Sequence, residues 1–326
     1  MQNTIILYQI VVLAILVVVG VLATRFKIIT EGLRKGLGDL VFDVTLPLLI
    51  VTTFARIEIS PDIIRDSGLV FLFAYLALGV MYLVGFISSG FLKLEGRQRA
   101  VYLNHHMFGN IVFLGFPLMD ALFPGGEGLL YAAIFQLASN SVMWTFGVWV
   151  FLRGNGGPRK KVWKNMLNTN TIAFFLGLLI MLSRIKLPDL VYEPLHGLGK
   201  STIYLSMLYI GALLMQTRVK GTLKKPHVFV LSFNKLLFVP FLLGIMINLL
   251  SYWIFPDFGD IARKVVLLES SMPCMATIVV MAHKFGSDEK LATENVFVST
   301  IFSLFTIPLV YAGLTMMDQI FQGWFI

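Results

Sequence analysis

Apolar runs of about twenty residues recur along almost the whole chain, and each is long enough to cross a hydrocarbon core of about 30 Å as an α-helix. Of the 326 residues, 57% are hydrophobic and 13% are charged, whereas a soluble domain has about 25% charged residues. Backbone N–H and C=O groups in lipid need partners within the protein, so these runs are expected to be helical. The sequence therefore predicts an all-α membrane protein.

Ten membrane-spanning helices are predicted, and the placement of the basic residues supports this number. With ten spans, most of the 26 Lys and Arg residues fall in connections on one side of the membrane. That bias predicts a cytoplasmic side, both termini outside, and a location in the cell (cytoplasmic) membrane. The first run has no basic leader and is expected to be retained. The predicted spans are 4–24, 37–55, 67–92, 100–122, 128–152, 169–185, 198–216, 227–255, 261–284 and 290–317.

The longest polar stretch, 153–168, divides the spans into two groups of five and is expected to be a cytoplasmic linker. Because five is odd, two homologous halves would lie in opposite orientations, as in many secondary transporters. A Gly-Leu-Gly motif opens the second span at 36–38 and the seventh at 197–199. We therefore predict an inverted 5+5 repeat, with halves 1–152 and 169–326.

The fourth and ninth spans are each interrupted near their middle, at Gly109-Asn110 and at Pro273. A proline within a helix removes a backbone hydrogen bond, and the freed groups are tolerated at membrane depth only inside protein or around a cavity. Each break creates the positive N-terminus of one half-helix and the negative C-terminus of another. Two breaks that meet would form an anion site beside a cation site at mid-membrane.

Polar residues at membrane depth are the candidates for this site. Glu269 precedes Pro273 by one helical turn and is predicted to bind or carry the coupling ion. On the fifth span, Gln136, Ser139, Asn140 and Thr145 recur at helical spacing and are predicted to form one wall of the cavity. The predicted substrate-binding residues are Gly109, Asn110, Pro273, Cys274, Thr277, Gln136 and Asn140, and the predicted coupling-ion residues are Glu269, Asn104, Ser270, Ser271 and Asp43.

Motifs for catalysis, metal binding and ATP hydrolysis are not found in the sequence. His105 and His106 are adjacent, about 100° apart on a helix, so they are poorly placed to bind one metal ion together. Residues 36–39 spell the GxGD signature of intramembrane aspartyl proteases, but the first span supplies no second acid. No phosphate loop is present. We expect no enzyme, no metal and no cofactor other than a coupling proton or sodium ion.

Two segments resemble the auxin efflux carrier family. Residues 109–118, Gly-Asn-Ile-Val-Phe-Leu-Gly-Phe-Pro-Leu, resemble its fourth-helix segment, and residues 269–273, Glu-Ser-Ser-Met-Pro, resemble its ninth-helix region. The short linker is similar to that of the microbial, PIN-like branch and not to the long hydrophilic loop of many plant carriers. The resemblance implies the inverted-repeat fold shared with bile-acid symporters and sodium/proton antiporters.

The resemblance also implies a scaffold domain (spans 1, 2, 6 and 7), which often mediates homodimers, and a transport domain (spans 3–5 and 8–10) that moves as an elevator. Asn110 matches an asparagine that contacts substrate carboxylate, and Pro273 matches the crossover proline. Glu269 lies where bile-acid-type symporters place a sodium-binding glutamate. Gly109 and Thr277 depart from the proline and asparagine common in the family, which leaves the substrate open.

The function expected from these features is secondary active transport of a small organic anion, such as a carboxylate, by alternating access. A proton gradient, a sodium gradient or the anion's own gradient would drive it. Two alternatives stay open: a sodium-coupled symporter of the bile-acid type, and a transporter-like sensor that binds solute without moving it. The expected partners are the anion, the lipid bilayer and a second copy of the chain. Nucleic acid is not expected, because the net charge of +8 resides in loops between apolar runs.

Overall fold

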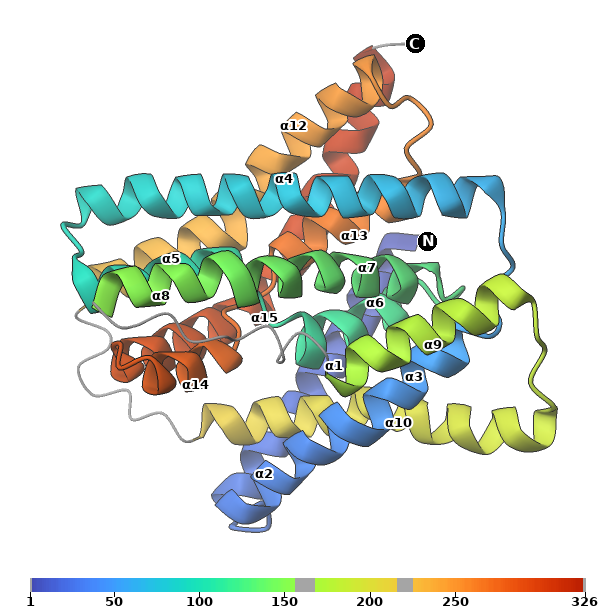
Figure 1. Ribbon diagram of the computed structural model, residues 1–326, viewed down its shortest axis with the longest axis horizontal. Coiled ribbons are helices and arrows are strands. Elements are labelled where there is room, and N and C mark those ends of the chain that lie inside the picture. The colour runs from blue at the N-terminus through green and yellow to red at the C-terminus, as the bar shows by residue number, and fades with distance from the viewer. Residues whose placement is uncertain (1, 156–167, 216–224, 325–326) are drawn as a thin grey trace.

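The computed structural model describes residues 2–155, 168–215 and 225–324 (Figure 1). Over these residues the secondary structure is helical, and the single β-type contact is an isolated antiparallel bridge between Gly109 and Cys274. The prediction of an all-α chain is confirmed. Most of the predicted linker 153–168 lies outside the described residues.

The first half of the chain contains five successive helical stretches, three of which include a π-helical turn, labelled η. They are α1 (Gln2–Arg25); α2 (Glu31–Leu40), η1 (Val41–Thr45) and α3 (Leu46–Phe54); α4 (Pro61–Phe91); α5 (Gly96–Met107), η2 (Ile111–Gly115) and α6 (Phe116–Leu122); and α7 (Glu127–Val142), η3 (Met143–Gly147) and α8 (Val148–Asn155).

The second half also contains five successive helical stretches, but its interruptions fall in the third and fourth of them. It consists of α9 (Thr169–Ser183); α10 (Asp189–Leu214); α11 (Pro226–Phe233), η6 (Asn234–Phe238) and α12 (Val239–Trp253); α13 (Asp260–Ser270) and α14 (Thr277–Lys284); and α15 (Glu289–Trp324).

Several helices begin before the predicted apolar run. α2 starts at Glu31, α4 at Pro61 and α10 at Asp189, each six or more residues earlier than predicted from hydropathy. The apolar pattern reports contact with lipid or core, whereas helical hydrogen bonding continues into polar residues. At the start of α4, Ser60 Oγ accepts a hydrogen bond from the Ile63 amide at 3.2 Å, a typical N-cap.

Five helical stretches of the described chain are long and apolar enough to cross a membrane: 31–54, 61–91, 189–214, 226–253 and 289–317. Shorter apolar helices occur at 11–25, 111–122 and 169–183. These helices support a multi-pass membrane protein. The number of ten spans, the inverted repeat and the orientation of the termini stay predictions.

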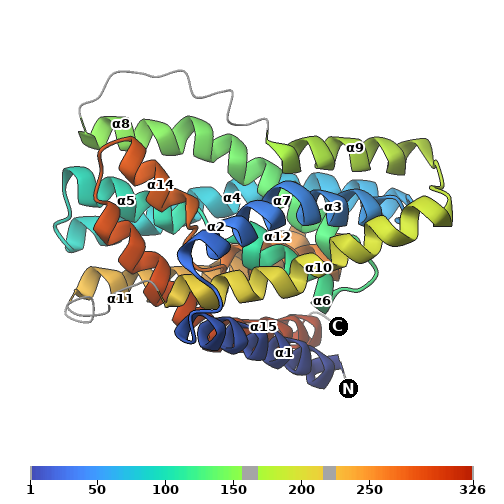
Figure 2. The same ribbon diagram turned by 90° about the horizontal axis from the view of Figure 1, so that it is seen from below.

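The helices pack as two groups. In the first, α1 packs along α10, α10 along α2 and α3, and α3 against α9; Figure 2 shows α9 and α10 on opposite sides of α3. In the second group, α4 packs against α5, α7 and α13, and α5 also packs against α8. α13 packs against α7 as well, and α15 packs against α11, α12 and α14. Fewer contacts join the groups, chiefly from α6 and η2 to α10 and from α3 to α7.

α1 and α10 approach so closely that glycines are required where they cross. A Cβ atom at Gly20 would lie 2.5 Å from the carbonyl oxygen of Leu208, and one at Gly211 would lie 2.7 Å from the Val21 amide nitrogen and overlap the Val17 carbonyl. Small residues at helix crossings are a common means of packing in membranes, where backbone contact replaces the hydrophobic effect.

Adding one methyl group at this crossing should destabilise the protein. We expect Gly211→Ala to lower the midpoint of thermal unfolding in detergent by several degrees, because overpacking against backbone typically costs about 1–3 kcal/mol. The matched control is Gly79→Ala on α4, where a Cβ would meet no atom within 4 Å and the midpoint should stay the same or rise slightly. Equal midpoints for the two variants would contradict the close crossing.

Candidate functional site

The broken fourth and ninth helices cross at their breaks. α5 ends at Met107 and η2 begins at Ile111, while α13 ends at Ser270 and α14 begins at Thr277. Between these half-helices the two extended segments run antiparallel. The Asn110 amide donates to the Pro273 carbonyl at 2.7 Å, and the Met275 amide donates to the Phe108 carbonyl at 3.2 Å. The segments thus satisfy each other's backbone groups, which membrane depth requires.

Gly109 and Asn110 have structural roles at this crossing. A Cβ at Gly109 would lie 2.9 Å from Met272 Cβ, so only glycine permits the close approach. Asn110 Oδ1 accepts a hydrogen bond from the Phe113 amide at 3.3 Å and caps the second half of the broken fourth helix. The Cys274 amide donates to Ser299 Oγ at 3.0 Å, and its thiol is buried. Gly109, Asn110, Pro273 and Cys274 thus lie together in the crossing itself.

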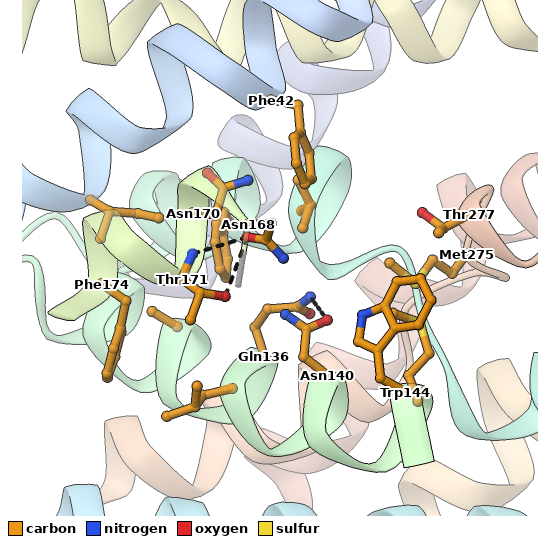
Figure 3. A pocket seen from close by; sticks show the side chains of 16 residues that line it. Phe42, Gln136, Asn140, Trp144, Asn168, Asn170, Thr171, Phe174, Met275 and Thr277 are labelled. Carbon is orange, nitrogen blue, oxygen red and sulfur yellow. Dashed lines mark hydrogen bonds between the residues drawn. The ribbon is translucent and has the colours of Figure 1, made fainter. Parts of the chain in front are cut away.

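The other three predicted substrate residues, Gln136, Asn140 and Thr277, line one cavity of about 70 Å³ beside the crossing. Figure 3 shows the two amides between Asn168 and Asn170 on one side and Trp144 and Thr277 on the other. Gln136 Nε2 donates to Asn140 Oδ1 at 2.9 Å. A cavity of this size holds several water molecules. Among the described residues, its lining contains no Asp, Glu, Lys, Arg or His.

The cavity offers hydrogen-bonding groups that lack partners among the described residues. They are Trp144 Nε1, Gln136 Oε1, and the Oδ1 and Nδ2 atoms of Asn170. Thr277 is the first residue of α14, so the cavity also faces the positive end of a half-helix. Ser139 and Thr145 were predicted to belong to the same wall, but they do not line this cavity. Thr145 is exposed, and its Oγ1 donates a hydrogen bond to the Ser141 carbonyl.

Glu269 is the most deeply placed acid of the crossing. It is 1% exposed, and neither carboxyl oxygen has a hydrogen-bond partner among the described residues. Its carboxyl rests against Gly115 of η2, where an added Cβ would lie 2.7 Å from Oε1. Glu269, on the ninth helix, therefore contacts the first turn of the second half of the broken fourth helix.

The remaining predicted ion residues divide into two groups. Asn104, Ser270 and Ser271 are buried, and both serine hydroxyls donate to carbonyls of their own helix, at Val266 and Leu268, each at 2.7 Å. Asn104 Oδ1 is buried without a partner among the described residues. Asp43 is exposed in η1, where it accepts a hydrogen bond from Thr169 Oγ1 at 2.9 Å, and it does not lie with Glu269.

Lys235, which was not among the predicted site residues, is fully buried in η6. Its Nζ donates to the carbonyl of His106 at 2.9 Å, at the negative end of half-helix α5. The ion pairs of the described residues do not include it. A lysine within the 28-residue apolar stretch 226–253 is the signal that could have identified it, because a charge at membrane depth is seldom without function.

His105 and His106 lie in the same buried region. His105 Nδ1 is 3.2 Å from Asn295 Nδ2, and His106 Nδ1 is 3.2 Å from the Tyr102 carbonyl. Within the described residues, no group of three or more His, Cys, Asp or Glu side chains is placed to hold a metal ion.

A bundle of apolar helices in which two interrupted helices cross beside a polar cavity is an arrangement found in membrane transport proteins. The model of the family described as "Membrane transport protein" matches residues 5–160 and 158–311. The chain belongs to this family, which is that of the auxin efflux carriers, and the resemblance noted in the sequence is confirmed.

Two relatives are similar over nearly their whole length. A protein of Methanocaldococcus jannaschii is 26% identical over 307 residues, covering 91% of this chain and 95% of the relative. A protein of Methanothermobacter thermautotrophicus is 25% identical over 305 residues, covering 90% and 94%. Both are named uncharacterized transporters, which agrees with the microbial branch of the family.

The contact between Glu269 and Gly115 can be tested by a double substitution. We expect Gly115→Ala to lower the thermal unfolding midpoint, because its Cβ would overlap the Glu269 carboxyl. Gly115→Ala combined with Glu269→Ala should lose less than the sum of the single losses, since contacting residues typically couple by about 0.5–3 kcal/mol. Strictly additive losses would show that the two residues do not touch.

Proposed function

We propose that this protein is a secondary carrier that moves a small organic anion, such as a carboxylate, across the membrane by alternating access. The observation that carries this proposal is the uncharged polar cavity at the start of α14. Amide and indole N–H groups together with a half-helix N-terminus can bind an anion reversibly without a fixed cation. Thr277, Asn140, Gln136, Trp144 and Asn170 are the proposed substrate ligands.

The cavity lies between the two packing groups, which supports movement of one against the other. Phe42, Asn170 and Phe174 line it from η1 and α9, whereas Asn140 and Thr277 line it from α7 and α14. We assign α1–α3, α9 and α10 to a scaffold domain and the remaining helices to a transport domain that moves as an elevator. In this proposal the chain has ten spans arranged as an inverted 5+5 repeat.

One ion pair would have to break during such movement. Lys200 Nζ on α10 donates to both carboxyl oxygens of Asp120 on α6, at 2.9 and 2.7 Å. The Asp120 side chain is 2% exposed and that of Lys200 is 37% exposed. This pair joins the two proposed domains and would hold the conformation described here.

For coupling, we propose that Lys235 occupies the place where a sodium ion would otherwise bind. The negative end of a broken half-helix is a common cation site, and at α5 the Lys235 ammonium already donates to the His106 carbonyl. Glu269, with its unpartnered carboxyl, is the proposed proton carrier. Lys235 thus favours a carrier that does not need sodium over the sodium-coupled alternative.

Transport should depend on the cavity residues and not on neighbouring polar groups. We expect Asn140→Leu and Thr277→Val to reduce uptake of carboxylates into proteoliposomes at least tenfold, because each removes a hydrogen-bonding group from the cavity. The matched control is Thr145→Val, which lies on the same helical stretch as Asn140 but faces outward and should transport normally.

Two outcomes would contradict this assignment. Normal counterflow by both cavity variants would place the substrate elsewhere. Substrate-induced thermal stabilisation of the wild type without any flux would favour the transporter-like sensor.

Sodium dependence tests the role of Lys235. We expect wild-type flux to be unchanged when choline replaces sodium, and Lys235→Met to reduce flux at least tenfold because the end of α5 loses its cation. Phe238→Leu, at an exposed position in the same helical turn, should behave as wild type. Loss of wild-type flux in choline would instead support the sodium-coupled symporter.

A further inference from the structure

Three helix ends meet in a groove that shares no lining residue with the proposed substrate cavity. The end of α4, the start of α5 and the end of α8 come together at one end of the molecule, at the left in Figure 1. The groove has a volume of about 430 Å³ and is lined from these three helices, with Arg99 on α5 and Arg153 on α8.

A row of four aromatic rings joins α4 to the α7–α8 stretch, and three of them, Tyr82, Phe86 and Trp149, line the groove. Phe86 and Tyr82 have ring centroids 5.9 Å apart, Tyr82 meets Phe146 edge-on at 4.9 Å, and Phe146 stacks on Trp149 at 5.3 Å. Phe86 and Trp149 at the ends of the row are 46% and 41% exposed. The row therefore offers an apolar aromatic surface to the surroundings.

A guanidinium group lies over each end of this row. Arg99 Cζ is 4.5 Å from the ring centroid of Phe86, and Arg153 Cζ is 5.2 Å from that of Trp149. Stacking on a ring fixes the plane of a guanidinium and leaves its N–H edges free to donate. Arg99 Nε also donates a hydrogen bond to Ser89 Oγ at 3.1 Å. This bond further restricts the Arg99 side chain.

Within the described part of the chain, neither arginine pairs with a carboxylate. The ion pairs of the described residues include neither of them, and no Asp or Glu lines the groove. Residues 156–167, which follow α8, contain no acidic residue that could pair with them. The groove also adjoins the positive N-terminal end of α5, which favours an anion, while the two guanidinium groups offset the partial negative charge at the C-terminal ends of α4 and α8.

The chemistry of the groove matches a lipid headgroup at a membrane interface. Aromatic rings gather at the boundary between hydrocarbon and water, and basic pockets between helices on the cytoplasmic side bind anionic headgroups. Two planar guanidinium groups suit the oxygens of a phosphodiester, and the exposed ring faces suit acyl or isoprenoid chains. A free phosphate would leave the aromatic wall without a partner.

We propose that this groove binds the phosphodiester headgroup of an anionic membrane lipid between Arg99 and Arg153, with the lipid chains along the aromatic row. The site is separate from the proposed substrate cavity and does not depend on the proposed function. Because α4, α5 and α8 pack together, a lipid bound here would brace the three helix ends against one another.

Lipid binding to the purified full-length protein tests the proposal. The thermal unfolding midpoint in neutral detergent is measured while phosphatidylglycerol or phosphatidylcholine is added, and bound lipids are counted by native mass spectrometry. We expect phosphatidylglycerol to raise the midpoint and to bind at least tenfold more tightly than phosphatidylcholine. Glycerol phosphate and inorganic phosphate at the same concentrations should have no effect.

Substitutions locate the binding. Arg153→Gln should weaken phosphatidylglycerol binding at least fivefold, Arg153→Lys should weaken it less, and Trp149→Ala should weaken it through loss of the apolar wall. The matched control is Arg97→Gln, an exposed arginine of α5 outside the groove, which should bind the lipid as the wild type does. Arg153 is exposed, and its interaction with the described residues is a ring contact, so its variants should fold.

Three results would overturn the proposal. Equal weakening by Arg97→Gln and Arg153→Gln would show a diffuse attraction to basic surface. Unchanged binding to a protein carrying both Arg99→Gln and Arg153→Gln would place the lipid elsewhere. Stabilisation by glycerol phosphate equal to that by the lipid would identify a site for a soluble anion.

Discussion

The need to satisfy backbone hydrogen bonds away from water governs the centre of this protein. Two helices stop and restart near their middle, and the freed amides and carbonyls find partners only because the breaks face each other. The Asn110 amide bonds to the Pro273 carbonyl, and the Met275 amide bonds to the Phe108 carbonyl. Gly109 permits the approach. Half-helix ends are thereby held at fixed positions, and their partial charges become available to solutes.

Three of the half-helix ends have different surroundings, and this produces an asymmetric site. The negative end of α5 receives the Lys235 ammonium, and the Glu269 carboxyl rests against the first turn of η2. The start of α14 faces a cavity of uncharged donors. In the proposed mechanism these differences separate the functions: the cavity binds the anion, Glu269 exchanges a proton and Lys235 replaces a metal cation.

Much of this arrangement was predicted from the sequence. The apolar runs predicted an all-α membrane protein, and Gly109-Asn110 and Pro273 marked the two interruptions. Gln136 and Asn140 on one helix and Thr277, far from them in the chain, line one cavity, although their role in substrate binding stays a prediction. Helix starts were predicted less well, since α10 begins at Asp189, ahead of the apolar run. Lys235 was not assigned, although a lysine inside an apolar stretch marks a candidate; its partner, a backbone carbonyl, is one that no side-chain motif reveals.

The sequence by itself determined the kind of protein, because length and hydropathy decide whether a helix can cross lipid, and glycine or proline decides where it breaks. Only the tertiary structure decided which polar residues share a site. Asp43 and Glu269 are both acids in predicted spans, yet one is exposed beside Thr169 and the other is buried against Gly115. Periodicity gives the face of a helix, but the neighbour on that face depends on how the helices pack, and no local pattern encodes that.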